Sequence, residues 1–210
     1  SKIANAGKKT LAVRFPKHKV ARSLLKMLNF PLAAPSANIS TRLSATCAMD
    51  VADEFRKKIK FILDGGQSRI GIESTIIDLT KRPTILRQGL ITAKNIKKIL
   101  KKKIKLNKNS KSIKSPGQLK LHYSPGMPVF LNKKYPKGKS AFVVFGKKFK
   151  SQKNYYNLSK NNDLNEAANN LYKIMRKIKD KKFKSISVSK IPNVGIGKAI
   201  NERLSKAANK

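Results

Sequence analysis

Apolar positions in the first ninety residues recur in two kinds of block, one with helical spacing and one typical of strands. Val20, Leu24, Leu25 and Leu28 follow helical spacing until Pro31, which cannot continue a helix. Apolar or β-branched runs bounded by Gly, Pro or charge predict strands at residues 11–15, 31–34, 60–63 and 74–79, with another ending at Arg87. This order predicts a mixed α/β unit.

Two more helices are predicted in this region from their N-terminal caps. Ser44 or Thr46 can cap a helix that runs to about Lys57. Thr92 can cap the next one, and its apolar face consists of Ile96, Ile99, Leu100 and Ile104.

The second half of the chain alternates strands and helices in a pattern typical of a small parallel sheet. Residues 141–145 are a continuous apolar run ended by Gly146, as in a strand covered on both faces. Asp163 and Glu166 predict a capping box for a long amphipathic helix. Residues 184–189 then predict a strand and residues 196–208 a terminal helix.

A polar segment, residues 101–118, separates the two halves. Three consecutive Lys are followed by Asn, Ser, Pro and Gly, a composition that does not pack into a core. We therefore predict an α/β protein of two units, over residues 1–106 and 128–210, joined by a linker or lid over residues 107–127.

The net charge is strongly positive and unevenly distributed. The 210 residues carry 49 Lys and Arg against 10 Asp and Glu, a formal charge of +39. Residues 1–92 have a net charge of +11 and residues 93–210 a net charge of +28. Such an excess favours RNA binding. Only nine of the cations are Arg, however, and Lys, Asn and Ile are abundant, so coding bias explains the excess equally well.

The cysteine and histidine counts exclude several kinds of disulfide, metal and catalytic site. One cysteine, Cys47, excludes an internal disulfide and a cysteine-built zinc site, and two histidines exclude a His-based metal site or triad. No apolar run approaches the roughly 20 residues of a membrane span. We expect a soluble, cytoplasmic protein without a protein-bound metal.

Small polar residues cluster before a predicted helix, in APSANIS at residues 34–40 and again at Ser44. Hydroxyls and backbone N–H groups at a helix N-terminus can bind phosphate. Ser and Asn also gather there for local turn and capping reasons, so both interpretations stay open.

Polar side chains also stand at strand ends. Glu73 and Ser74 open a β-branched strand and could line a pocket, or form ladder-edge hydrogen bonds and a solvated face. Arg14 and Arg87 each close an apolar run and could hold a carboxylate or phosphate, or simply end a strand in solvent.

An aromatic pair interrupts the polar linker. His122 and Tyr123 lie between two Ser-Pro turns in SPGQLKLHYSPG, residues 115–126. Such a segment can close over a ligand as a lid. Alternatively, Leu121 and Tyr123 anchor an ordinary linker to the surface.

The motifs TLAVRFP, PLAAPSANIS, ILDGG, GIESTIIDL, TILRQG and the SPG-to-HYSP segment occur in an order and spacing that resembles the YrdC-type threonylcarbamoyl-AMP synthases, in the long form with a C-terminal extension domain. The similarity covers residues 1–128 strongly, and VGIGKAINERLSKAA resembles the end of the extension more loosely. The resemblance implies part of a YrdC-like twisted mixed-sheet domain and a small Rossmann-like parallel α/β domain.

That family makes threonylcarbamoyl-AMP and pyrophosphate from ATP, L-threonine and bicarbonate, for threonylcarbamoyl modification of tRNA adenosine next to the anticodon. The resemblance implies ATP as a substrate with Mg²⁺ and tRNA-modification proteins that take the adenylate. The basic charge indicates transfer or double-stranded RNA as a contact of the basic surface. No membrane partner is expected, because no apolar run is long enough to span a bilayer.

The resemblance also assigns roles to individual residues. It implies threonine binding by Arg14, the Ala34 backbone and Ser74, with loop support from Asn38 and Glu73. It implies ATP binding by Thr10, Ser36, Ser44, Arg87 and Tyr123.

The sequence departs from the family pattern at two places. Thr41 and Leu43 stand where Gly and Pro are usual in the family. The family's N-terminal motifs, with a Lys and an Arg that clamp the triphosphate, do not occur in this sequence, and we expect Ser1 to follow them. We therefore expect a piece of a longer enzyme, nearly inactive alone and without identifiable catalytic residues. A non-catalytic RNA-binding module is the alternative. A related carbamoyl-transfer domain is disfavoured because the His122–Tyr123 segment is typical of stand-alone synthases.

Overall fold

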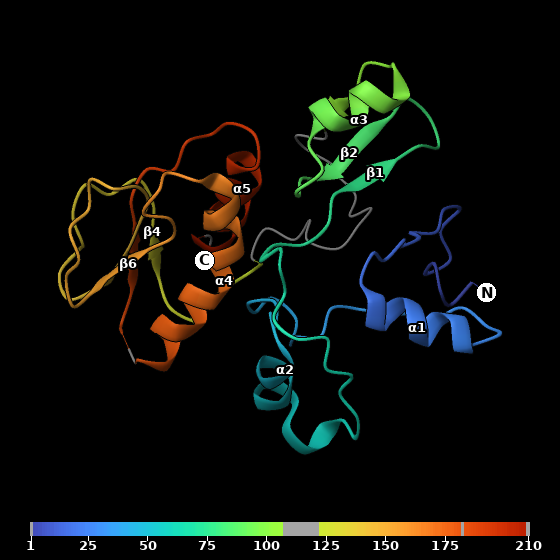
Figure 1. The fold of residues 1–210 in the computed structure, drawn as a ribbon, viewed down its shortest axis with the longest axis horizontal. Coiled ribbons are helices and arrows are strands. Elements are labelled where there is room, and N and C mark those ends of the chain that lie inside the picture. The colour runs from blue at the N-terminus through green and yellow to red at the C-terminus, as the bar shows by residue number, and fades with distance from the viewer. Residues whose placement is uncertain (1, 107–121, 182, 209–210) are drawn as a thin grey trace.

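The chain forms two separate sheets in the computed structural model (Figure 1). The structure describes residues 2–106, 122–181 and 183–208. Three strands, β1 (Ile76–Asp78), β2 (Thr84–Arg87) and β3 (Lys105–Leu106), form the first sheet in that order. The second sheet has the order β4 (Val129–Phe130), β7 (Ile186–Val188), β5 (Ala141–Val144), β6 (Tyr155–Asn157). The predicted α/β class, with a mixed sheet and a parallel sheet, is confirmed.

The second sheet is entirely parallel and forms the larger part of the hydrophobic core. Its strands are β4 (Val129–Phe130), β5 (Ala141–Val144), β6 (Tyr155–Asn157) and β7 (Ile186–Val188). All residues of β5 and β7 are buried, as the continuous apolar run of β5 predicts. Sequence patterns missed β4 and β6, which are only two and three residues long.

Two helices pack on this sheet, α4 (Leu164–Asp180) and α5 (Gly197–Ala208). α4 connects β6 to β7, which pairs in parallel with β5, as a parallel connection requires. Asp163 caps α4 by accepting from Asn165 N at 2.7 Å. The predicted capping box is wrong in its second half, because the Glu166 carboxylate accepts from Ser159 Oγ.

The first sheet is small and mixed. β1 (Ile76–Asp78) pairs antiparallel with β2 (Thr84–Arg87), and β2 pairs in parallel with β3 (Lys105–Leu106). β3 lies within the polar segment 101–118, where no strand is predicted, and its backbone pairs with Thr84 and Ile85. Residues 107–121 of the predicted linker lie outside the described residues.

Three helices belong to the first half: α1 (Lys19–Met27), α2 (Ala48–Phe55) and α3 (Ala93–Leu100), with a 3₁₀ turn η1 (Arg56–Lys58) after α2. The predicted Thr92 cap of α3 is confirmed, and Asn95 completes a capping box. Ile99 does not join the predicted apolar face, since it is 77% exposed. The predicted caps of α2 are wrong, because Cys47 is the N-cap and forms no side-chain cap bond.

Three predicted strands, at residues 11–15, 31–34 and 60–63, are not strands in the structure. Several of their apolar side chains face solvent: Val13 is 83% exposed, Phe15 97% and Phe61 91%. A strand needs a neighbouring strand for its backbone hydrogen bonds, and in the described part of the chain these segments have none.

Candidate active site at the junction of the two halves

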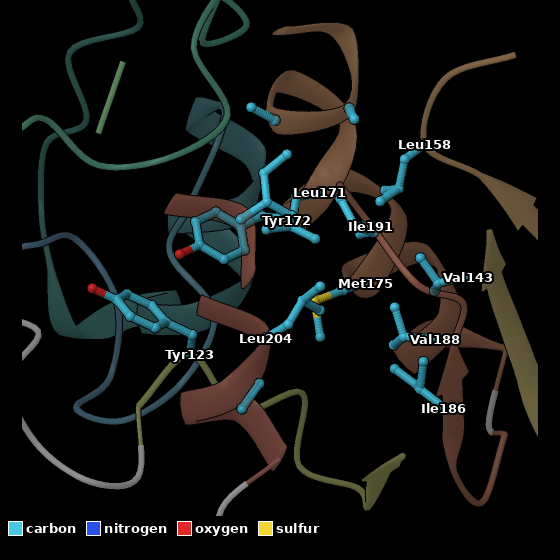
Figure 2. Close-up of a cluster of buried hydrophobic side chains, with 14 of the residues drawn as sticks. Tyr123, Val143, Leu158, Leu171, Tyr172, Met175, Ile186, Val188, Ile191 and Leu204 are labelled. Atoms are coloured by element: carbon cyan, nitrogen blue, oxygen red, sulfur yellow. The ribbon is translucent and has the colours of Figure 1, made fainter. Parts of the chain in front are cut away.

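The two halves of the chain share one hydrophobic cluster. Leu43, Ile72 and Tyr123 are buried together with apolar side chains of α4, α5 and the second sheet. In Figure 2, Tyr123 and Tyr172 lie at one end of this cluster, and their hydroxyls point away from the aliphatic side chains. At Gly71 a Cβ atom would lie 2.1 Å from the backbone oxygen of Asn169 in α4. The first half therefore packs directly against α4.

Glu73 is the centre of the polar contacts at this junction. Its Oε1 accepts from Ser44 Oγ, and its Oε2 accepts from Tyr172 Oη and from Arg203 Nε, each at 3.1 Å. Arg203, only 1% exposed, also donates to the carbonyl oxygens of Gln88 and Glu73. Both carboxylate oxygens of Glu73 are thus bonded, by side chains from three separate segments.

The ionisation of Glu73 determines what Ser44 can do. Burial by itself would raise the pKa of Glu73, but the Arg203 guanidinium and the Ser44 hydrogen bond outweigh it, so this pKa lies below its ordinary value of 4.5. A carboxylate has no proton to donate, so Ser44 donates its only hydroxyl proton to Glu73. While this bond persists, Ser44 Oγ can only accept a hydrogen bond from a ligand.

The lowered pKa of Glu73 predicts a loss of stability in acid. The folded chain binds this proton more weakly than the unfolded chain, so the stabilisation is present above about pH 4.5 and is lost as the pH falls through the folded-state pKa. We expect the urea midpoint to fall less steeply below pH 4.5 in Glu73→Gln than in the parent. Glu166→Gln is the matched control, because Glu166, like Glu73, accepts a hydrogen bond from a serine hydroxyl. An equal decrease of the urea midpoint below pH 4.5 in Glu73→Gln and in the parent would contradict this assignment.

Arg87 is a buried cation at the end of β2, with 6% of its surface exposed. Its Nε donates to Ser74 O at 3.0 Å and its Nη2 to Ser74 Oγ at 3.5 Å. Among the described residues, no carboxylate lies within ion-pair distance of it. Burial lowers the pKa of Arg87, and the charges of Arg203 and Arg14 lower it further against the effect of Glu73. Arg87 is therefore suited to binding an anion.

Tyr123 is buried between the two halves, at 1% exposure. Its ring stacks on Tyr172 with centroids 5.9 Å apart, and the Arg203 guanidinium lies 5.5 Å from its centroid. Burial, aided by Glu73, raises the pKa of Tyr123 to about 12, and its hydroxyl has no hydrogen-bond partner among the described residues. A buried tyrosine hydroxyl without a partner is available to a ligand.

The segment after Tyr123 is tied to the first half. Ser124 N donates to Thr41 O at 2.8 Å, and Ser124 pairs with Arg42 in a parallel bridge. Thr41 has a φ of 70°. The lid predicted for residues 107–127 falls mostly outside the described residues, and its described end is an anchored turn.

The structure brings together part of the predicted site. Ser44, Ser74, Arg87 and Tyr123 surround Glu73 and its partners, and Arg14 is close enough to Arg87 to affect its pKa. Asn38 is buried and donates to the carbonyls of its own loop, as expected of a supporting residue. Four predicted site residues are exposed, and no described hydrogen bond joins them to this cluster: Thr10, Arg14, Ala34 and Ser36.

Sequence patterns missed the residues that the second half contributes. Tyr172, Arg176 and Arg203 all contact the first half through side-chain hydrogen bonds. Tyr172 follows the helical pattern of α4 and resembles any core residue. The two arginines carry one signal, because they are the only Arg residues after residue 92, among 32 cations.

Two features are absent from the described residues. These residues contain no group of three or more His, Cys, Asp or Glu side chains placed to hold a metal ion. Nor do they contain a helix long and apolar enough to cross a membrane.

Fold and site define a two-unit α/β protein with a cationic polar site where the units meet. Residues 1–89 match the family described as "Telomere recombination", and residues 91–209 match the family "Threonylcarbamoyl-AMP synthase, C-terminal domain". The second match alone covers more than half of the chain, so the chain belongs to the threonylcarbamoyl-AMP synthase family. The resemblance drawn from the motifs is confirmed.

Individual relatives agree with this assignment. The chain is 32% identical to a threonylcarbamoyl-AMP synthase of Pyrococcus abyssi, with 99% of the chain and 66% of the relative covered. It is 33% identical to the Bacillus subtilis protein of the same name, with 97% and 64% covered. The crystal structure of "P. abyssi Sua5 complexed with L-threonine" superposes with a TM-score of 0.86 over 99% of this chain and 66% of that one. The chain thus spans about two thirds of the length of these relatives.

Proposed function

We propose that this chain is part of an L-threonylcarbamoyladenylate synthase, a nucleotidyltransferase that converts ATP, L-threonine and bicarbonate to threonylcarbamoyl-AMP and pyrophosphate. The observation that carries the proposal is Arg87, a buried cation that is bonded to Ser74 and has no described carboxylate within ion-pair distance. The names of the relatives, and the L-threonine complex of one of them, support the choice of substrates.

The reaction needs charge neutralisation and positioning more than acid–base chemistry. The threonine amine forms a bond to the bicarbonate carbon, from which a C–O bond breaks and water leaves, to give a carbamate. A carbamate oxygen then attacks the α-phosphorus, and the bond from that phosphorus to the pyrophosphate oxygen breaks. Cationic and hydrogen-bonding groups that hold the carbamate in line with the phosphorus supply the rate enhancement. Arg14 would hold the threonine carboxylate, and Arg87 would neutralise phosphate charge.

The remaining site roles stay predictions of this proposal. Thr10, Ser36, Ser44 and Tyr123 would contact ATP, while the Ala34 backbone and Ser74 would contact threonine. Because its proton is bound to Glu73, Ser44 would accept from an N–H or O–H group of the ligand rather than donate to a phosphate oxygen. Magnesium would enter with ATP as part of the substrate.

The partners follow from the product. Threonylcarbamoyl-AMP is a reactive mixed anhydride, so a tRNA-modification protein must take it before water does. Transfer RNA contact through the Lys-rich second half is part of the proposal. The alternative of a non-catalytic RNA-binding module is not favoured by the relatives. The RNA affinity of such a module would be unchanged in Arg14→Ala and Ser36→Ala, and it would decrease steeply as the salt concentration rises.

Threonine binding tests the proposal on the chain itself. We expect L-threonine to bind saturably in a calorimetric titration and Arg14→Met to weaken that binding about tenfold or more, because a charge-assisted bond to the carboxylate is lost. Arg22→Met is the control, since Arg22 is an exposed cation on α1. Equal affinities in the parent and in Arg14→Met would contradict the role given to Arg14.

A further inference from the structure

Two arginines of the second half converge on one residue of the candidate nucleotide site. Arg176 in α4 donates from Nη2 to Leu43 O at 2.8 Å and from Nε to Ser44 O at 3.3 Å. Arg203 in α5 contacts Glu73, which in turn accepts from Ser44 Oγ. The backbone and the side chain of Ser44 are thus each connected to a different helix of the C-terminal domain.

The charges at this junction complement each other closely. Residues 1–92 contain only six carboxylates, and three of them, Asp50, Glu54 and Glu73, form ion pairs with Arg176 or Arg203. Both arginines are largely buried, with 14% and 1% of their side chains exposed. Lysine could not reproduce this pattern, because a guanidinium presents several donors in a fixed plane and an ammonium does not.

We infer that Arg176 and Arg203 are positioning residues through which the C-terminal domain holds Ser44 in its place in the nucleotide site. Arg176 fixes the Leu43–Ser44 backbone through two carbonyl oxygens. Arg203 fixes the Glu73 carboxylate, and Glu73 fixes the direction of the Ser44 hydroxyl. This inference gives the C-terminal domain a role in the site, and it rests on the proposed function for the identity of the ligand.

Simple adhesion between the two halves would make a different prediction from positioning. If the two arginines only hold the halves together, replacing them should weaken ATP binding and threonine binding equally. If they position Ser44, replacing them should weaken the binding of the ligand that Ser44 contacts. Arg176 forms no described bond with Arg14, Ala34 or Ser74, the residues assigned to threonine. Replacing the Arg176 guanidinium should therefore weaken ATP binding and leave threonine binding unchanged.

The test is calorimetric titration of ATP and of L-threonine into the full chain, its Arg176→Lys variant and its Arg203→Lys variant. We expect the ATP dissociation constant to rise about tenfold in Arg176→Lys while that of threonine stays within about twofold. The ATP dissociation constant of Arg203→Lys should lie between those of Arg176→Lys and the parent, because a lysine retains the charge opposite Glu73. Lys198→Met, an exposed cation of α5, should change neither constant.

A second readout keeps the inference apart from the proposed function. In ¹⁵N-serine spectra, the Ser44 amide peak is identified by its absence in Ser44→Thr, and it should move in Arg176→Lys and Arg203→Lys but not in Lys198→Met. If the parent binds no ATP, the ATP-binding roles proposed for this chain by itself fail, and the Ser44 peak alone decides the inference. An unmoved Ser44 peak, or equal losses of ATP and threonine affinity, would overturn the inference.

Discussion

Replacing Arg203 by methionine is expected to lower the free energy of unfolding by about 3–5 kcal/mol. Methionine matches the volume of the arginine stem and leaves Glu73 in a site where burial opposes its charge. Gln88 O also loses a donor. The measurement is urea unfolding at pH 7, followed by far-ultraviolet circular dichroism.

A double-mutant cycle separates the ion pair from the packing of the side chain. Because Glu73→Gln removes the charge that Arg203 balances, Arg203→Met should cost less in the Glu73→Gln background than in the parent. Additive effects would show that Arg203 stabilises the chain through packing alone. Lys198→Met, on the exposed side of α5, should stay within about 0.5 kcal/mol of the parent.

Replacing Arg87 by methionine is expected to weaken ATP binding by about 2–3 kcal/mol, a factor of roughly 30 to 150. Burial has already removed water from the guanidinium and lowered its pKa, so a phosphate oxygen would gain a donor with little competition from solvent. The fold should persist, because among the described residues Arg87 forms hydrogen bonds only with the Ser74 carbonyl and hydroxyl.

The control for Arg87 is Arg82→Met, since Arg82 is exposed shortly before β2. Titration of ATP into both variants at fixed ionic strength gives the comparison, because general electrostatic attraction would fall equally in the two. Equal losses of affinity would contradict a phosphate contact at Arg87 and would indicate a non-specific cationic surface.

Elements with strong local signals could be predicted from the sequence. Capping at Thr92 and Asp163, and the buried run of β5, are determined within a few neighbouring residues, so the sequence alone located α3, α4 and the centre of the parallel sheet. Apolar runs such as Val13 to Phe15 carry the same composition without forming a strand. Whether such a run becomes a strand depends on a partner strand, which local composition does not encode.

The residues of this cluster that could be suggested from the sequence all lie before the C-terminal unit, for a comparable reason. Motif order located Ser44, Ser74 and Arg87 near one another, and the fold brings them to Glu73. The contributions of Arg176 and Arg203 depend on the docking of two units, across more than a hundred residues of sequence. Nothing near either arginine in the sequence indicates that docking, and only the scarcity of Arg in a Lys-rich half gives a hint.

Release of pyrophosphate from ATP tests the synthase assignment most directly. The measurement compares this chain with a chimera in which these residues replace the matching part of the Pyrococcus abyssi relative, at equal ionic strength and with both proteins verified as folded. We predict release that requires both threonine and bicarbonate in the chimera, its loss in the Arg87→Met chimera, and little release from the chain alone. A folded chimera that releases no pyrophosphate and instead binds RNA tightly, with a steep salt dependence, would contradict the assignment.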